Sequence, residues 1–279
     1  MTCSYPHPHL SHPLEGEGAK TALRIVSQSP YITLQLEWLG LKACIVGASR
    51  DDTGVQAADT GGVMDPDGAA IAALRPDLMI TSVWTKAARW AALTPPGTRA
   101  LRLESFQSMA QIEANLREIG QAAAHVVDLA NIEARVQAFA QGWRDAAAAI
   151  NATMNAAVNA TINAQGRRVV LLSHCSGRYY AYGRDTWLHD LFSTAGFVVV
   201  ETHTGVRLVP LDDSPEGLSA LLTVGRAATV FYLRRCSTVA CERPLPEGVP
   251  VAVLNGDLFL HPAPCLIAAL DSLLEDRSW

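Results

Sequence analysis

The sequence predicts an α/β protein with two Rossmann-like lobes, each built on a mostly parallel sheet, and one long backbone helix between them. Three observations support this prediction. Apolar runs of strand length alternate with helical patterns in the first part of the chain, the alternation stops over a long Ala-rich stretch, and it resumes after Gly166. Strands that alternate with helices form parallel sheets covered on both faces. We expect a ligand cleft between the two lobes.

The first lobe is expected over residues 23–125, after a leading segment, residues 1–22, whose composition is typical of disorder. Pro30 interrupts the first apolar run, and Gly40 is placed to end the helix that follows. The predicted strands are Leu23–Ser27, Cys44–Gly47, Leu78–Ser82 and Ala100–Leu103, and the predicted helices are Ile32–Leu39, Pro66–Leu74 and Ser108–Gly120. In the last of these helices the apolar residues recur at helical spacing.

The connecting helix is expected within residues 126–165. Between Val126 and Asn163 the chain has no proline and a single glycine, Gly142. A helix of about 30 residues spans about 45 Å, which exceeds the size of one small domain. The Asn-rich stretch AINATMNAAVNATINA weakens the helical prediction toward its end.

The second lobe is expected over residues 166–279, where the alternation of strands and helices resumes. The predicted strands are Arg168–Ser173, Phe197–Val200, Thr229–Leu233 and Val251–Leu254, and the predicted helices are Thr186–Ala195, Pro215–Leu222 and Pro264–Leu274.

Composition and motifs exclude several classes of protein. The formal net charge of −5 and the absence of any Lys/Arg run argue against nucleic-acid binding. No apolar run reaches the roughly 18 residues of a membrane span. No nucleophile elbow, phosphate loop, zinc-protease motif or dinucleotide fingerprint is present, so we expect no enzymatic activity. Residues 1–22 lack the apolar core of a signal peptide, which predicts a cytoplasmic protein, or a periplasmic one if the start site is misassigned.

Ligands of open α/β sheets bind beyond the carboxyl ends of the strands. The loops that follow the predicted strands are therefore candidates for ligand binding. In the first lobe these are Ser27, Gln28 and Ser29 after the first strand, Arg50 after the second and Trp84 after the third. Trp84 would offer a flat apolar face to a ring system. The serines are equally suited to capping the following helix, and for Arg50 a surface loop is favoured over a ligand contact.

In the second lobe, the loop predicted over residues 174–184 is unusually rich in tyrosine and arginine, as ligand sites often are. Arginines at the end of the strand near residue 233 could pair with ligand carboxylates. The candidate contacts are Tyr179, Tyr180, Tyr182, Arg184, Arg234, Asp257, Phe259 and His261.

Bare metal binding has weaker support. His174, Cys175 and Cys236 are the candidates, and they would fit a metallochaperone or an enzyme on the same scaffold. Their spacing does not match the paired Cys-x-x-Cys pattern of structural zinc sites. His174 and His261 are also candidates for an axial ligand to cobalt or iron.

Four segments carry a resemblance to a known family. They are RIVSQSPYITLQLEWLGLKACIVGASRDD (Arg24–Asp52), LRPDLMI (Leu74–Ile80), SFQSMAQIEANLREIG (Ser105–Gly120) and LNGDLFLHPAPCLIAALDSL (Leu254–Leu273). In this order they resemble the helical-backbone metal-chelate receptors, the class III periplasmic substrate-binding proteins for vitamin B12, iron-siderophores and haem. The resemblance implies a non-enzymatic binding protein of the ABC-transporter-associated type without a covalent cofactor. The RYYAYGRDTW and VFYLRRC segments favour a corrinoid as ligand, with ferric siderophore or haem as the alternatives.

One departure from the family concerns its membrane partner. Transport members carry one exposed glutamate in each lobe that docks on the permease, and here Ala69 and Ser219 stand at these positions, with Asp67 and Glu216 nearby. The resemblance therefore leaves the permease partnership in doubt. It allows a cytoplasmic relative that stores or transfers its chelate.

Overall fold

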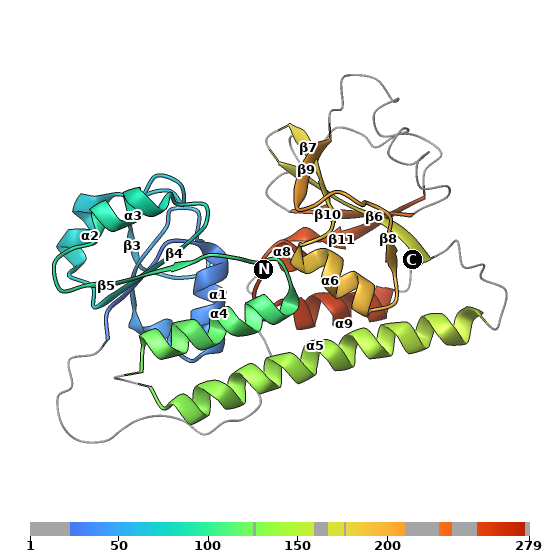
Figure 1. Ribbon diagram of the computed structural model, residues 1–279, viewed down its shortest axis with the longest axis horizontal. Coiled ribbons are helices and arrows are strands. Elements are labelled where there is room, and N and C mark those ends of the chain that lie inside the picture. The colour runs from blue at the N-terminus through green and yellow to red at the C-terminus, as the bar shows by residue number, and fades with distance from the viewer. Residues whose placement is uncertain are drawn as a thin grey trace. The chain divides into compact units, whose positions relative to one another are not determined.

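The computed structural model describes residues 23–124, 127–158, 167–175, 177–209, 229–235 and 250–276. The chain divides into two compact units. Unit 1 comprises Met1–Ser105 and Ala114–Gln137, and unit 2 comprises Phe106–Glu113 and Ala138–Trp279. Each unit contains one sheet, and a single long helix contributes residues to both (Figure 1). The predicted α/β fold with two sheets and a long backbone helix is confirmed.

The sheet of unit 1 has five strands in the order β3-β2-β1-β4-β5, and all neighbouring strands are parallel. The strands are β1 (Ile25–Ser27), β2 (Ile45–Ala48), β3 (Ala58–Asp59), β4 (Leu78–Ser82) and β5 (Arg99–Leu103). Helices α1 (Pro30–Trp38), α2 (Gly68–Leu74) and α3 (Ala87–Leu93) alternate with them. Strands β1 and β4 are buried along their whole length, as expected for the centre of a parallel sheet. Val26, Ile71, Met79 and Trp90 pack together in the core.

Helix α5 (Leu129–Val158) is the 30-residue backbone helix that the sequence predicts. In unit 1, Arg117 of α4 (Met109–Ala122) forms a two-pronged ion pair with Glu133 of α5, with both N–O distances at 2.8 Å. In unit 2, the carboxylate of Glu113 accepts hydrogen bonds from the Trp143 indole at 3.1 Å and from Arg144 at 2.8 Å. Helix α5 is thus fastened to α4 by charged and polar contacts in both units.

Gly142 shows why a glycine is present inside α5. A β-carbon at this position would lie 2.9 Å from the Cδ1 atom of Ile267, which belongs to α9 (Leu266–Asp276). Glycine inside a helix costs about 1 kcal/mol relative to alanine. Here that cost allows α9 to pack closely against α5.

The sheet of unit 2 has the order β11-β10-β6-β7-β9, and β8 pairs with β6. The strands are β6 (Arg168–Cys175), β7 (Arg178–Tyr182), β8 (Val198–Val199), β9 (Val206–Val209), β10 (Thr229–Arg234) and β11 (Val251–Asn255). The helices are α6 (Trp187–Thr194), α8 (Gly256–Phe259) and α9. Strands β8, β10 and β11 run parallel to their neighbours, whereas β7 pairs with β6 and β9 in antiparallel fashion. The predicted helix Pro215–Leu222 lies outside the described residues.

The prediction of a loop over residues 174–184 is wrong for most of its length. Strand β6 continues to Cys175, and the chain returns as β7 from Arg178 to form a hairpin. Gly177 has a φ of 75°, a left-handed conformation that glycine adopts without strain. The many polar and aromatic residues of this segment concealed the two-residue alternation of a strand.

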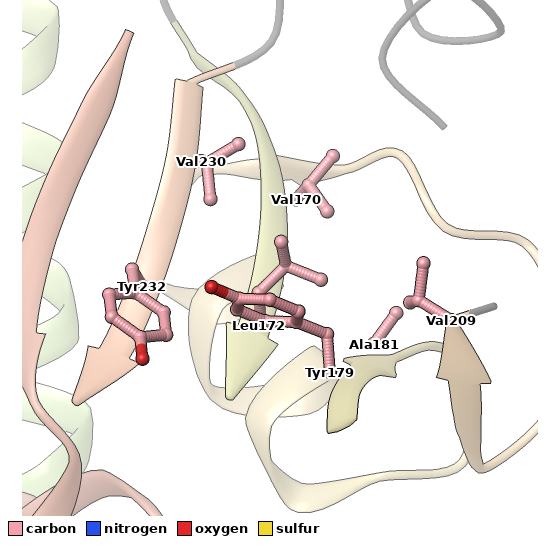
Figure 2. Packing of buried hydrophobic residues seen from close by; sticks show 7 residues of the cluster. All are labelled: Val170, Leu172, Tyr179, Ala181, Val209, Val230 and Tyr232. Carbon is pink, nitrogen blue, oxygen red and sulfur yellow. The ribbon is translucent and has the colours of Figure 1, made fainter. Parts of the chain in front are cut away.

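Aromatic and branched side chains fill both faces of the second sheet. Figure 2 shows Tyr179 reaching from β7 across β6 toward β10, among side chains of one face: Val170, Leu172, Ala181, Val209, Val230 and Tyr232. On the other face, Phe192 of α6 contacts Phe197, Phe231 and Phe259, with ring centroids 5.7, 5.4 and 5.3 Å away.

None of the helices in the described part of the chain combines the length and apolar character that a membrane span needs.

A buried polar chain lies at the carboxyl edge of the first sheet. The Thr33 hydroxyl donates to the Ser27 hydroxyl at 2.8 Å, and the Asp52 side chain hydrogen-bonds to Thr33 and accepts from the Gly54 amide at 3.0 Å. Burial raises the pKa of Asp52, although these hydrogen bonds act in the opposite direction. The ionised carboxylate is therefore a net cost to the folded state.

Replacing Phe192 with alanine should lower the free energy of unfolding by about 3–5 kcal/mol, because a ring with three aromatic partners is lost from a closed core. Urea unfolding followed by circular dichroism measures this change. Val198→Ala, at an exposed strand position, should change stability by no more than about 0.5 kcal/mol. A loss below 1 kcal/mol for Phe192→Ala would contradict the described core.

Asp52→Asn should stabilise the protein at pH 7 and have little effect near pH 4. A carboxyl whose pKa is raised on folding stabilises the fold below its unfolded pKa, and this contribution is lost as the pH rises through the folded value. Asparagine keeps the hydrogen-bond acceptor and removes the charge. Urea unfolding at both pH values tests this, with the exposed Asp145→Asn as control; equal stability of wild type and Asp52→Asn at pH 7 would refute it.

Candidate ligand-binding loops

The loops that the sequence nominates in unit 1 leave the same edge of the sheet. All five strands are parallel, and Ser27 at the end of β1 is aligned with Ala48 of β2 and Ile80 of β4. The Gln28 amide donates to the Ile80 carbonyl at 2.9 Å, and the Ser49 amide donates to the Ser27 carbonyl at 3.0 Å. The segments after β1, β2 and β4 are therefore neighbours.

Ser27, Gln28 and Ser29 are fully buried and hold this edge together. The Gln28 side-chain amide donates to the carbonyls of Thr60, Gly61 and Gly62 at 3.1–3.2 Å and accepts from the Thr60 hydroxyl at 2.9 Å. Ser29 takes the N-cap position of α1, although its hydroxyl makes no capping hydrogen bond. These side chains have almost no exposed surface, so in this structure they stabilise the loops from within the protein.

Trp84 is the most prominent exposed aromatic residue of unit 1, with 59% of its surface accessible. Its turn is fixed by its neighbours: the Thr85 hydroxyl donates to the Val63 carbonyl at 2.7 Å, and Arg102 donates to the carbonyls of Thr85 and Val83 at 2.8 and 3.2 Å. An exposed indole is thus held on a rigid support at the carboxyl end of β4.

Two further apolar side chains are exposed on the same pair of loops. Met64 is 71% exposed and Val83 is 37% exposed. The hydrogen bond between Thr85 and Val63 joins the loop of Met64 to that of Trp84. Sequence reasoning missed Met64, since a single methionine among glycines and aspartates gives no periodic signal. We refer to Met64, Val83 and Trp84 as the Trp84 patch.

Arg50 follows β2 and is exposed at the same edge. Its guanidinium lies 4.0 Å from the carboxylate of Asp59, and both side chains are largely accessible to solvent. An exposed pair at this distance contributes little to stability. Arg50 can therefore turn toward a ligand at small cost.

The tyrosines of unit 2 divide by face, because successive strand residues point to opposite sides of a sheet. Tyr179 is buried in the core, 4.9 Å from the His174 ring. Tyr182 is also buried: its hydroxyl lies 3.0 Å from that of Ser173, and burial raises its pKa. Tyr180 is only partly buried, and Arg184 is exposed. Of this group, Tyr180 and Arg184 have accessible surface, but β7 runs antiparallel to β6, so Arg184 does not follow the carboxyl end that β6, β10 and β11 share.

Arg234 ends β10 and Arg235 follows it, beside β11 and α8. Arg234 is aligned with Asn255 of β11. A β-carbon on Gly256 would lie 2.7 Å from both the Arg234 carbonyl carbon and the Leu233 carbonyl oxygen, so glycine is required for α8 to begin this close to β10. Phe259 is buried, whereas Asp257 and His261 are partly exposed at this edge.

The two metal candidates within the described residues, His174 and Cys175, point to opposite faces of the sheet, because they are adjacent residues of β6. His174 is 2% exposed, and Cys175 is exposed. Cys236 lies outside the described residues. Across the described ranges, no three side chains of the ligating types His, Cys, Asp and Glu gather closely enough to hold a metal ion.

Ala69, at the first expected docking position, is exposed in the first turn of α2. The carboxylate of Asp67 accepts from the Ala69 and Ala70 amides at 2.9 and 3.1 Å, which makes it the N-cap of that helix. Ser219 and Glu216 lie outside the described residues. Docking on a permease stays a prediction.

No protein-family model matches the chain, and a search of curated proteins finds no match. Solved structures do match. The periplasmic heme-binding protein RhuT from Roseiflexus sp. RS-1 is 17% identical with a TM-score of 0.69, over 92% of this chain and 100% of that one. The periplasmic vitamin B12 binding protein BtuF of Vibrio cholerae is 16% identical with a TM-score of 0.64, over 90% and 95%. The siderophore binding protein FhuD from Vibrio cholerae, solved with Fe3+-Desferal, is 17% identical with a TM-score of 0.64, over 90% and 98%.

Likeness at this level of identity concerns the fold. It extends over nine-tenths of this chain and nearly the whole of each matched structure. The chain therefore has the fold of the class III periplasmic binding proteins, as its resemblance to the metal-chelate receptors predicts.

Proposed function

We propose that this protein binds a metal-chelate small molecule and catalyses no reaction, and that the carboxyl-end loops of the sheet in unit 1 are part of the binding surface. The observation that carries the proposal is the Trp84 patch, an exposed indole on a turn fixed by hydrogen bonds. Soluble proteins seldom expose a rigidly held tryptophan beside other apolar side chains unless that surface binds something. A flat, largely apolar chelate ring is a suitable partner.

The choice among chelates follows from the same surfaces. Haem, vitamin B12 and siderophore proteins all share this fold. The exposed Arg234 at the end of β10 favours a ligand that carries carboxylates or other acceptors on its rim. We keep corrinoid, haem and ferric siderophore as candidates, with the corrinoid suggested by the sequence resemblance.

The proposal includes transport and location. The similarity to a periplasmic heme-binding protein and a periplasmic vitamin B12 binding protein supports the periplasmic alternative over the cytoplasmic one. We propose that the protein delivers its chelate to an ABC transporter. Because Ala69 stands at the first expected glutamate position, docking on the permease would have to use other residues.

Titration of the purified protein with haemin, aquocobalamin and ferrioxamine B tests the function directly. At least one of them should produce a saturable change in absorbance with a stoichiometry of one chelate or a small whole number per chain. The proposal fails if none binds.

Trp84→Ala should weaken binding of that chelate by about 1–3 kcal/mol, roughly 5- to 150-fold, because stacking and apolar burial are lost. Equilibrium titration by absorbance or fluorescence measures the dissociation constant. Val198→Ala is the matched control, since it truncates an exposed apolar side chain at the amino end of β8. Equal affinity of Trp84→Ala and wild type would show that the Trp84 patch is not the binding surface.

A further inference from the structure

Met64 stands at the tip of a tight turn. The amides of Gly62 and Asp65 each donate to the carbonyl of the other residue at 3.1 Å, and Val63 and Met64 lie between them. The Asp65 carboxylate also pairs with the guanidinium of Arg89 on α3. Among the large apolar side chains of the described residues, that of Met64 is the most exposed. A fixed turn thus presents one flexible apolar side chain to solvent.

Three side chains fasten this turn from the loops around it. The Val63 amide donates to the Asp51 carboxylate at 3.2 Å, and the Val63 carbonyl accepts from the Thr85 hydroxyl at 2.7 Å. The Gln28 side-chain amide donates to the Gly62 carbonyl at 3.1 Å. Gln28, Asp51 and Thr85 follow β1, β2 and β4 respectively. The turn is therefore tied to each of the three neighbouring segments at the carboxyl edge of the sheet.

Thr85 links this turn to Trp84, the residue directly before it in the chain. The side chains of Thr85 and Thr81 are fully buried, and their hydroxyl oxygens lie 2.6 Å apart. A hydroxyl group has a single proton to donate, and that of Thr85 is used on the Val63 carbonyl, so Thr81 is the donor in this pair. A buried chain of two hydroxyl groups therefore runs from β4 to the turn of Met64.

We propose that Thr85 is a positioning residue of the chelate site, and that its hydroxyl group holds Met64 at a fixed position relative to Trp84 so that both side chains contact the bound chelate. The inference rests on the proposed function and deepens it. The Thr85 hydroxyl is buried and already bonded, so it acts through Val63 and does not touch the chelate. Contact groups that are fixed before binding lose less conformational freedom when they bind, and more of their contact energy appears as affinity.

Substitution of Thr85 tests the role of its hydroxyl group. Thr85→Val keeps the shape of the side chain and removes both hydrogen bonds, whereas Thr85→Ser keeps the hydroxyl group. The variants of the full chain are titrated with haemin, aquocobalamin and ferrioxamine B, and the dissociation constant is measured for each chelate that wild type binds. Thr85→Val should bind at least about fivefold more weakly, and Thr85→Ser should bind within about twofold of wild type. Thr85→Ala, which also lacks the hydroxyl group and places no methyl group beside the Val63 carbonyl, serves in its place where the valine variant does not fold.

Thr98→Val is the matched control for a purely structural role. The Thr98 hydroxyl donates to the Pro76 carbonyl at 2.7 Å, the same distance as the bond of Thr85, but it lies at the amino ends of β4 and β5. Urea unfolding should show a loss of stability for both valine variants, because each loses a hydrogen bond to a backbone carbonyl. Only Thr85→Val should lose affinity for the chelate.

The same titration in a Met64→Ala background identifies what Thr85 positions. Met64→Ala alone should weaken binding at least about threefold, because apolar contact with the chelate is lost. In this background, adding Thr85→Val should change the dissociation constant by no more than about twofold, since the turn of Trp84 remains fixed by Arg102.

The outcomes separate this inference from the proposed function. Wild-type affinity in Met64→Ala or in Thr85→Val, or an equal loss on adding Thr85→Val with and without Met64, would overturn the role of Thr85 and leave chelate binding intact. A loss of affinity in Thr98→Val as large as that in Thr85→Val would overturn it as well, because the effect would then follow from stability alone. Failure of wild type to bind any of the three chelates would overturn the proposed function and this inference with it.

Discussion

The candidate site depends on one constraint, which is that neighbouring parallel strands end at the same edge of a sheet. In unit 1 this constraint applies to every strand, and it brings the residues after β1, β2 and β4 together although they are far apart in the sequence. In unit 2 it applies to β6, β10 and β11. The exposed residues Arg50, Trp84, Arg234 and His261 lie at or after the carboxyl ends of such strands, whereas Tyr180 and Arg184 belong to or follow the antiparallel strand β7.

The exposed groups are held by buried groups that do not themselves reach a ligand. Gln28 joins the loop after β3 to that after β1 through three backbone carbonyls, and Arg102 fixes the turn of Trp84. In unit 2, Gly256 and the Trp187 indole hold the segment of His261. Groups held in place before binding lose little conformational freedom on binding, so more of the contact energy appears as affinity.

The sequence predicts most elements of the fold because buried parallel strands are short apolar runs that composition reveals. Leu78–Ser82 coincides with β4 to the residue, and the long helix is found because proline is absent over its length. Helix α3 was not predicted, since its seven residues span too few turns to show a period. Strand β7 was taken for a loop because its tyrosines and arginines look like loop residues. Both errors concern segments whose identity depends on tertiary partners.

The sequence predicts which loops belong to the candidate site, but it does not predict which of their side chains are exposed to a ligand. Sequence position names the segments after each strand, but orientation decides which residue faces outward. Tyr179 and Tyr180 are adjacent and chemically identical, yet one is core and the other is partly exposed. Phe259 is buried against Phe192, whereas His261, two residues later, stays accessible. Such distinctions depend on strand register and helix packing, which one sequence does not reveal.

Hydrogen–deuterium exchange with and without a saturating chelate tests the central claim most directly. The account predicts slower exchange in segments that follow the shared carboxyl ends of parallel strands, namely residues 49–51, 83–86 and 256–262. Segments at the opposite ends, residues 75–77, 97–98 and 195–197, should exchange at unchanged rates. Protection confined to these latter segments would contradict the account.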